Sequence, residues 1–214
     1  MDPSQILKIA YLNIHGQSKF TEAKQVQIQD FILYNDIDVA HLQETEICED
    51  TFSECSHISS SFNLISNNAA NKYGTSSLVK NELSYENVKC DTSGRGIVFD
   101  IGDITLGNFY GHSGTDARSR ASRENFCAEI VPQLLSNTKN SGCIGGDWNC
   151  ILDKMDATAN PEAKLSNSLK RVVKNFDMVD SFRTTPRCKP TQGTTMMLGP
   201  RELPELTVSI TGVM

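Results

Sequence analysis

The stretch GGDWN at residues 145–149 ends a short apolar run, and it decides how the rest of the chain is interpreted. Alternation along a strand would point the carboxylate of Asp147 and the carboxamide of Asn149 the same way. A strand end of this kind can present an acid and an amide together to a phosphate or a metal ion. The alternative is an ordinary turn in which Asn149 makes a local hydrogen bond. The rest of the sequence decides between the two.

The composition is that of a soluble globular protein. The 214 residues suit one domain with a substantial core, and 38% of them are hydrophobic and 21% charged. A net charge of -6 argues against a protein that coats nucleic acid, although a metal-dependent nuclease stays possible because its site concentrates carboxylates. The seven cysteines form no C-x-x-C pair, so reduced thiols are expected. With no secretory signal and no membrane-length apolar run, we expect a nuclear or cytoplasmic protein that is neither secreted nor membrane-bound.

Two clusters of basic residues are candidates for contacts with a nucleic-acid backbone. The alternative for both is a solvated helix face. The clusters are Arg118, Arg120 and Arg123, and then Lys164, Lys170, Arg171 and Lys174.

The pattern of apolar residues predicts a mixed α/β chain. It begins with a strand over Ile6–Asn13 that is buried on both faces, a helix over Glu22–Asn35 and a strand over Ile37–Leu42. In the helix, Ala23, Val26, Phe31 and Leu33 are expected to face the core. Five further strands, 62–65, 76–79, 85–90, 96–101 and 104–110, suggest antiparallel pairing, with a tight hairpin at Gly102-Asp103. Helices are predicted over 121–135 and 166–176, and a strand over 141–149.

Polar residues at the ends of these strands occur in an order that resembles the endonuclease/exonuclease/phosphatase superfamily, which includes DNase I and the apurinic endonucleases. The segments are Asn13, Gln43-Glu44-Thr45, residues 108–113 and residues 145–149. From Gly145 to Arg183 the chain is most similar to the apurinic-type endonuclease domain of LINE-type (non-LTR) retrotransposons. The resemblance covers Ile6 to about Thr191. It implies a DNase I-like four-layer α/β sandwich, in which two packed β-sheets are flanked by helices.

The resemblance also implies a role for each site residue. Glu44 would be the main ligand of a Mg²⁺ or Mn²⁺ ion, with Asn13 beside it. Tyr110 and Asn149 would donate hydrogen bonds to the scissile phosphate of DNA, and Asp147 would orient or deprotonate the attacking water. No organic cofactor is implied. Taken singly, each of these residues has an ordinary structural explanation.

The histidines fit this pattern less well. His112 follows the phosphate-binding tyrosine of the resembling pattern and is interpreted as structural. His41 lies on an apolar strand and is expected to be a satisfied, buried imidazole.

The sequence after Thr191 departs from the family pattern. The family ends with a strand carrying Ser-x-Ile-Asp and then a Ser-Asp-His motif, and neither is present. If the codons of residues 204–210 are re-read from their third bases, the bases that the residues fix permit Arg-Ile-Asp-Arg-Ile-Tyr. We therefore expect a frameshift near Thr191, dividing the chain into a truncated nuclease-like domain over 1–191 and an aberrant, poorly ordered tail over 192–214.

The sequence thus favours a Mg²⁺-dependent DNA endonuclease domain from a retrotransposon, incomplete at its C-terminus and impaired. Two alternatives remain at this stage. One is a phosphodiesterase of the same superfamily that acts on phosphoinositides or sphingomyelin, and Trp148 and the LINE-like segment favour the DNA branch over it. The other is a non-catalytic remnant or binding protein with the same fold. The oligomeric state and the target site are not predicted.

Overall fold

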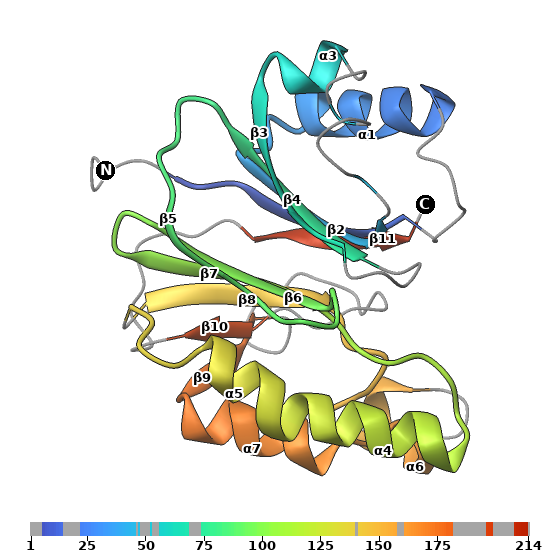
Figure 1. Ribbon diagram of the computed structural model, residues 1–214. Coiled ribbons are helices and arrows are strands. Elements are labelled where there is room, and N and C mark those ends of the chain that lie inside the picture. The colour runs from blue at the N-terminus through green and yellow to red at the C-terminus, as the bar shows by residue number, and fades with distance from the viewer. Residues whose placement is uncertain are drawn as a thin grey trace.

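Two β-sheets pack face to face, and helices cover the outer face of each (Figure 1). The computed structural model describes residues 6–14, 22–45, 47, 52, 56–68, 74–139, 141–157, 161–181, 196–198 and 208–213. Sheet A has the strand order β11-β1-β2-β4-β3, and sheet B has the order β5-β6-β7-β8-β10-β9. Helices α1 and α3 cover sheet A, and α4 to α7 cover sheet B. This is the four-layer α/β sandwich that the sequence predicted.

The elements follow the predicted order closely. Sheet A consists of β1 (Ile9–Asn13), β2 (Val39–Thr45), β3 (Phe62–Asn67), β4 (Gly74–Lys80) and β11 (Val208–Val213). Sheet B consists of β5 (Glu86–Cys90), β6 (Gly96–Ile101), β7 (Ile104–Tyr110), β8 (Ser141–Asp147), β9 (Met178–Asp180) and β10 (Met196–Leu198). The helices are α1 (Glu22–Tyr34), α3 (Ser56–Ser59), α4 (Ala117–Asn125), α5 (Val131–Leu134), α6 (Pro161–Lys164) and α7 (Asn167–Asn175).

Three apolar clusters fill the spaces between the four layers. Strand β1 contributes to two of them, because Tyr11 faces the other sheet while Ala10 and Leu12 pack with residues of α1. Its buried run on both faces confirms the prediction for this strand. The third cluster joins sheet B to its helices through Phe109, Phe126 and other side chains.

One prediction about α1 is wrong. Val26 and Leu33 are 45% and 59% exposed, and Ala23 is also exposed, whereas Ile28 and Ile32 are buried against sheet A. Residues four apart lie on one face of a helix, so the stripe through Ile28 and Ile32 turns Val26 and Leu33 away from the sheet.

The predicted helix over 121–135 starts earlier and contains a wide turn. It begins at Ala117 because the carboxylate of Asp116 caps it, accepting from the backbone N–H groups of Arg118 and Ser119 at 2.9 and 3.0 Å. A π-helical turn over Phe126–Ile130 then precedes Pro132, which has no N–H to donate. These segments of nine, five and four residues follow one another without a break and form one helical rod on sheet B.

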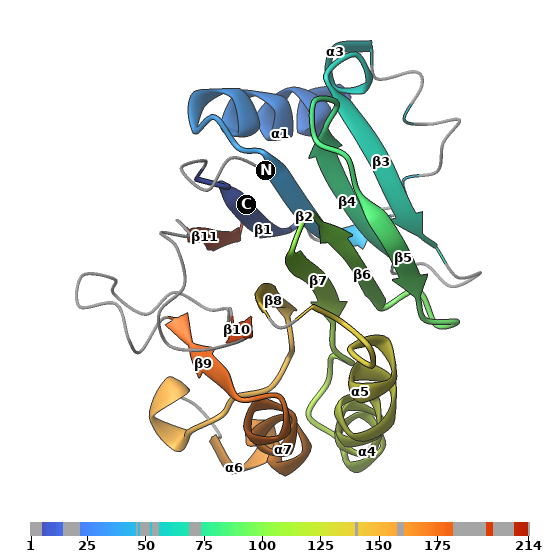
Figure 2. The same ribbon diagram turned by 90° about the vertical axis from the view of Figure 1, so that its left-hand side faces the viewer.

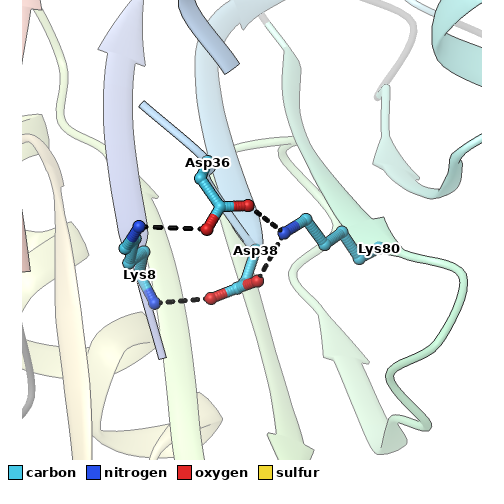
Figure 3. Close-up of polar contacts among 4 residues, drawn as sticks. All are labelled: Lys8, Asp36, Asp38 and Lys80. Carbon is cyan, nitrogen blue, oxygen red and sulfur yellow. Dashed lines mark hydrogen bonds and ion pairs between the residues drawn. The ribbon is translucent and has the colours of Figure 1, made fainter. Parts of the chain in front are cut away.

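A cluster of four charged residues ties together the end of sheet A that lies opposite the carboxyl ends of β1 and β2 (Figure 3). The amine of Lys80 contacts Asp36 at 2.9 Å and Asp38 at 2.8 Å, and the amine of Lys8 contacts Asp36 at 3.0 Å. The backbone N–H of Lys8 also donates to Asp38 at 2.8 Å. These contacts lower the pKa of Asp36 to about 2, mainly through its hydrogen bonds with Lys80 and Lys8.

The C-terminal segment contains two strands that its sequence did not suggest. Strand β10 pairs antiparallel with β8 and β9, and β11 pairs parallel with β1 (Figure 2). These strands at residues 196–198 and 208–213 were not predicted from the sequence, and that the tail is aberrant and poorly ordered stays a prediction. The remainder of 192–214 lies outside the described residues, so the division into a domain and a tail stays a prediction.

Among the cysteines, Cys127, Cys143 and Cys150 are buried and Cys90 is exposed, and all four are free thiols. Cys48, Cys55 and Cys188 lie outside the described residues.

No helix in the described part of the chain is both long and apolar enough to cross a membrane.

Candidate functional site

The carboxyl ends of four strands bring the predicted polar residues together. Strands β1 and β2 run parallel with Asn13 opposite Gln43, and β7 and β8 run parallel with Tyr110 opposite Asp147. Since parallel neighbours end at the same edge of a sheet, each pair presents its polar residues on one side. The packing of sheet A on sheet B then joins the two pairs.

Asn13 links the two carboxylates of the site. Its amide nitrogen, Nδ2, donates to Oε1 of Glu44 at 3.0 Å and to Oδ2 of Asp147 at 2.8 Å. The phenol of Tyr110 donates to the same Oε1 of Glu44 at 3.1 Å. One hydrogen-bond chain therefore connects Asn13, Glu44, Tyr110 and Asp147, which come from four different strands and from both sheets.

Glu44 occupies an irregular position in β2. Its φ angle is 57°, in the left-handed region that a glutamate seldom adopts, and the pairing of β2 with β4 shifts register between Gln43 and Thr45. A bulge of this kind re-aims a side chain next to an active site. Because of the bulge, the Glu44 carboxylate meets Tyr110 of the opposite sheet.

The glycines near β8 allow a close approach of two backbones. Gly146 has a φ of 132°, and a Cβ atom there would lie 1.9 Å from the carbonyl oxygen of Phe109. A Cβ on Gly111 would lie 2.0 Å from the carbonyl oxygen of Trp148. The ring of Trp148 is buried and stacks on Phe109 with centroids 5.0 Å apart, so this residue belongs to the core. The segment 145–149 is therefore built around a tight crossing with the end of β7.

Asn149 completes the turn after β8. Its backbone N–H donates to Oδ1 of Asp147 at 3.0 Å, and its Nδ2 donates to the carbonyl of Gly111 at 3.0 Å. Its φ of 51° is another left-handed value, which asparagine tolerates better than most residues. The structure thus brings together all five predicted site residues, and the local turn that was the alternative for Asn149 is present as well.

Arg95 is a neighbour of the site that the sequence analysis missed. Its guanidinium lies 4.8 Å from the centroid of the Tyr110 ring and donates to the carbonyls of Tyr110 and Gly111 at 3.2 and 3.3 Å. Burial raises the pKa of Tyr110 above its ordinary value, the Glu44 carboxylate raises it further, and Arg95 acts in the opposite direction. The phenol is therefore a hydrogen-bond donor at neutral pH. In the sequence, the position of Arg95 directly before β6 gives no sign of its contact with Tyr110.

The two histidines whose side chains the structure describes, His41 and His112, do not join the hydrogen-bond chain of the site. His41 is buried between the sheets, where it stacks on Tyr11 and its Nδ1 shares a 2.8 Å hydrogen bond with Ser77. The expectation that this imidazole is fully satisfied is wrong, because its Nε2 has no partner among the described residues. Burial lowers the pKa of His41 to about 3. The ring of His112 packs edge-on to Phe126, and burial lowers its pKa as well.

The basic clusters divide into one structural residue and several exposed ones. Arg123 is only 2% exposed and donates to the carbonyls of His112, Gly114 and Ala163 at 2.8, 3.0 and 3.2 Å. It braces the loop after β7 against α6, so it is neither a backbone contact for DNA nor part of a solvated face. The exposed members are Arg118, Arg120, Lys170, Arg171 and Lys174.

The donor set fits a hard divalent cation. Glu44 and Asp147 supply carboxylate oxygens, and Asn13 supplies a carboxamide oxygen beside them. Mg²⁺ takes oxygen ligands and commonly uses one or two carboxylates together with waters. Over the described ranges, no group of three or more His, Cys, Asp or Glu side chains gathers into a fuller site. Any ion here would rely on few protein ligands.

Strand β11, one of the two neighbours of β1, has no acidic residue and no histidine in its sequence. In the parallel pairing of β1 with β11, Asn13 lies opposite Val213, and β11 has the sequence Val-Ser-Ile-Thr-Gly-Val. On the β11 side, Asn13 therefore has as its neighbour a strand whose sequence contains no titratable residue.

Comparison with solved structures identifies the fold. The chain superposes on an AP endonuclease from Archaeoglobus fulgidus with a TM-score of 0.69 and 13% identity, over 91% of this chain and 87% of the other. It superposes on the 3′-5′ exonuclease NExo from Neisseria meningitidis with a TM-score of 0.68 and 14% identity, over 88% and 86%. For truncated TDP2 from Caenorhabditis elegans, the TM-score is 0.56 and the identity 15%, over 89% and 83%.

These likenesses establish a DNase I-like α/β sandwich. A Neisseria NExo structure, similar at a TM-score of 0.62 and 14% identity over 89% of this chain and 86% of the other, holds a product DNA hairpin. At the level of sequence, the chain matches no family model and no curated protein.

Proposed function

We propose that this chain is a divalent-metal-dependent phosphodiesterase domain of the endonuclease/exonuclease/phosphatase superfamily whose substrate is DNA. The observation that carries the proposal is the hydrogen-bond chain through Asn13, Glu44, Tyr110 and Asp147 at the strand ends. Its residues are 134 positions apart at the extreme, so no local turn explains their meeting. Solved structures with this fold include an AP endonuclease and an exonuclease.

Each residue has a defined task in this proposal. Glu44 and the Asn13 amide oxygen would hold a Mg²⁺ or Mn²⁺ ion, which when bound stabilises negative charge on the phosphate oxygens and leaving group. The Tyr110 phenol, kept protonated by its burial, would donate to a phosphate oxygen. The Asn149 amide would donate to the same phosphate. The Asp147 carboxylate would orient the attacking water or accept its proton.

We further propose that the site is half complete and the activity impaired. Superfamily members of the apurinic type place an aspartate and a histidine from their last strands beside these residues, whereas β11 of this chain supplies neither. The inferred frameshift near Thr191 would account for that difference. The same hypothesis assigns the chain to a LINE-type retrotransposon, on the similarity of residues 145–183.

Cleavage of supercoiled plasmid tests the proposal. We expect the chain to nick DNA slowly in Mg²⁺ or Mn²⁺, to stop when the metal is chelated, and to lose the residual activity in Glu44→Gln. A version with the inferred frame restored should nick at least about 10²-fold faster, since a general base contributes about 10²–10⁴ in rate. Equal rates for the two versions would contradict the impairment, and metal-independent nicking by the restored version would contradict the proposed function.

A further inference from the structure

Asn108 reaches across the interior from one sheet to the other and ends beside the Glu44 bulge. It lies on β7 of sheet B and is completely buried. Its Nδ2 donates to the carbonyl of Leu42 on β2 at 3.1 Å and to the carbonyl of Ser76 on β4 at 2.9 Å. Its Oδ1 accepts from the Nε2 of Gln43 at 2.7 Å. Three hydrogen bonds of this one side chain therefore lie next to the bulge, on the N-terminal side of Glu44.

The partners of Asn108 lie in sheet A directly before the point where the regular pairing of β2 with β4 is interrupted. The register of β2 against β4 shifts between Gln43 and Thr45, and a shift of this kind disrupts the backbone ladder locally. Buried carbonyl oxygens near such a break need donors from elsewhere, because a buried polar group without a partner is costly. From the opposite sheet, the Asn108 amide donates to two such carbonyl oxygens, those of Leu42 and Ser76.

We propose that Asn108 is a positioning residue that holds the bulged backbone at Glu44 and thereby aims the Glu44 carboxylate at Asn13 and Tyr110. Side chains two apart on a strand point the same way, so Asn108 and Tyr110 both project from β7 toward sheet A. Asn108 fixes the backbone around Glu44, and Tyr110 donates to its carboxylate. Two side chains of β7 thus act on Glu44: Asn108 holds its backbone conformation, and Tyr110 is a hydrogen-bond partner of its carboxylate. The consequence for metal binding rests on the proposed function.

A simple contribution to stability is the alternative, and Thr105 provides a matched control for it. Thr105 is also completely buried on β7, three residues before Asn108. Its hydroxyl donates to Asp100 at 2.6 Å and accepts from the backbone of Lys139 at 3.0 Å, so it makes none of the contacts around Glu44. Thr105→Val should lower the melting temperature without moving Glu44. Asn108→Ala should do both.

The test compares wild type, Asn108→Ala and Thr105→Val with two readouts. NMR scalar couplings report the φ angle of Glu44, and electron paramagnetic resonance of added Mn²⁺ reports the metal affinity. We expect Asn108→Ala to move Glu44 out of the positive φ region and to weaken Mn²⁺ binding by about 10- to 100-fold, as loss of a residue that orients a ligand does. Thr105→Val should keep φ positive and the affinity within about twofold of wild type. In a Glu44→Gln background, Asn108→Ala should have no further effect on Mn²⁺.

The two readouts separate this inference from the proposed function. A wild-type chain that binds no Mn²⁺ contradicts the metal site, and the φ of Glu44 then still decides the role of Asn108. A positive φ retained in Asn108→Ala overturns the inference. If that variant does not fold, Gln43→Met removes the partner of the Asn108 oxygen and leaves its amide in place. Unchanged φ and unchanged Mn²⁺ affinity in that variant would overturn the inference equally.

Discussion

Asn13 and Asp147 lie 134 residues apart in the chain, yet the amide of Asn13 donates to the carboxylate of Asp147 at 2.8 Å. One residue comes from sheet A and the other from sheet B. Their contact therefore reports how the sheets are packed, and it places the acid of the GGDWN stretch beside Glu44 at the shared edge. The candidate site depends on this packing more than on any single loop.

Arg123 should be essential for stability, in contrast to the exposed arginines of the same helix. Arg123→Met leaves the carbonyls of His112, Gly114 and Ala163 without their donor, so it should lower the free energy of unfolding by about 2–4 kcal/mol. Arg118→Met, at an exposed position, should change it by less than about 0.5 kcal/mol. Urea titration of both variants checks this. Equal stabilities would show that the contact of Arg123 with the loop after β7 and with α6 is unimportant for stability.

Gly146 should not accept a side chain. Gly146→Ala combines a φ of 132° with a Cβ atom 1.9 Å from the Phe109 carbonyl, so we expect a loss of at least about 1–3 kcal/mol in the free energy of unfolding. Gly96→Ala is the matched control, because its closest neighbour is the movable end of the Leu134 side chain at 2.6 Å. Chemical denaturation should show the larger loss for Gly146→Ala. A larger loss for Gly96→Ala would contradict the tight crossing of β7 and β8.

Burial of a neutral His41 should make the protein sensitive to mild acid. Burial in the folded state lowers the pKa of His41 from 6.5 to about 3. Between these two pH values His41 is therefore protonated in the unfolded chain and neutral in the folded chain. The free energy of unfolding should therefore fall as the pH drops from about 6.5 toward 3, by up to about 1.4 kcal/mol per pH unit. His41→Gln should remove this slope. A slope equal to that of wild type would show that other groups cause it.

Asp36 should act in a lower pH window. Its pKa is lowered from 3.8 to about 2, so its contribution is present above pH 3.8 and is lost as the pH falls toward 2. Asp36→Asn should therefore leave the slope between pH 6.5 and 4 unchanged, which also makes it a control for His41→Gln. Unfolding curves at a series of pH values measure both effects. A change confined to the region above pH 4 would contradict the assigned ion pairs of Asp36.

Local signals in the sequence predicted most of the strands and helices and placed polar residues at the strand ends, whereas the choice of five site residues came from the resemblance and stays a prediction. Apolar runs mark strands such as Ile104–Tyr110, whose predicted bounds match β7, and polar residues such as Asn13 mark their ends. The resemblance supplied the sandwich, which periodicity alone does not specify. Contacts between side chains across the interior produce no local pattern in the sequence. The bonds of Asn108, the stacking of Arg95 on Tyr110 and the burial of Arg123 depend on sheet packing, and a charged or polar residue looks solvent-exposed in a sequence.

The C-terminal strands escaped the sequence analysis for a different physical reason. Strand β10 has only three residues, too few to show a period, and β11 contains a glycine and two hydroxyl residues that weaken its apolar pattern. Both strands form by pairing with edges that the rest of the fold provides, namely β1 and β8. Tertiary context therefore decided their structure.

The shared edge of the two sheets is expected to bind a divalent cation through Glu44. The most direct measurement is a Mn²⁺ titration of wild type and Glu44→Gln followed by electron paramagnetic resonance, with Glu86→Gln as a control acid on the surface of β5. We expect saturable binding of one ion to wild type and to Glu86→Gln, and binding at least about tenfold weaker in Glu44→Gln, because metal affinity depends on the number of charged ligands. Equal affinity in Glu44→Gln and wild type would show that Glu44 is not a metal ligand.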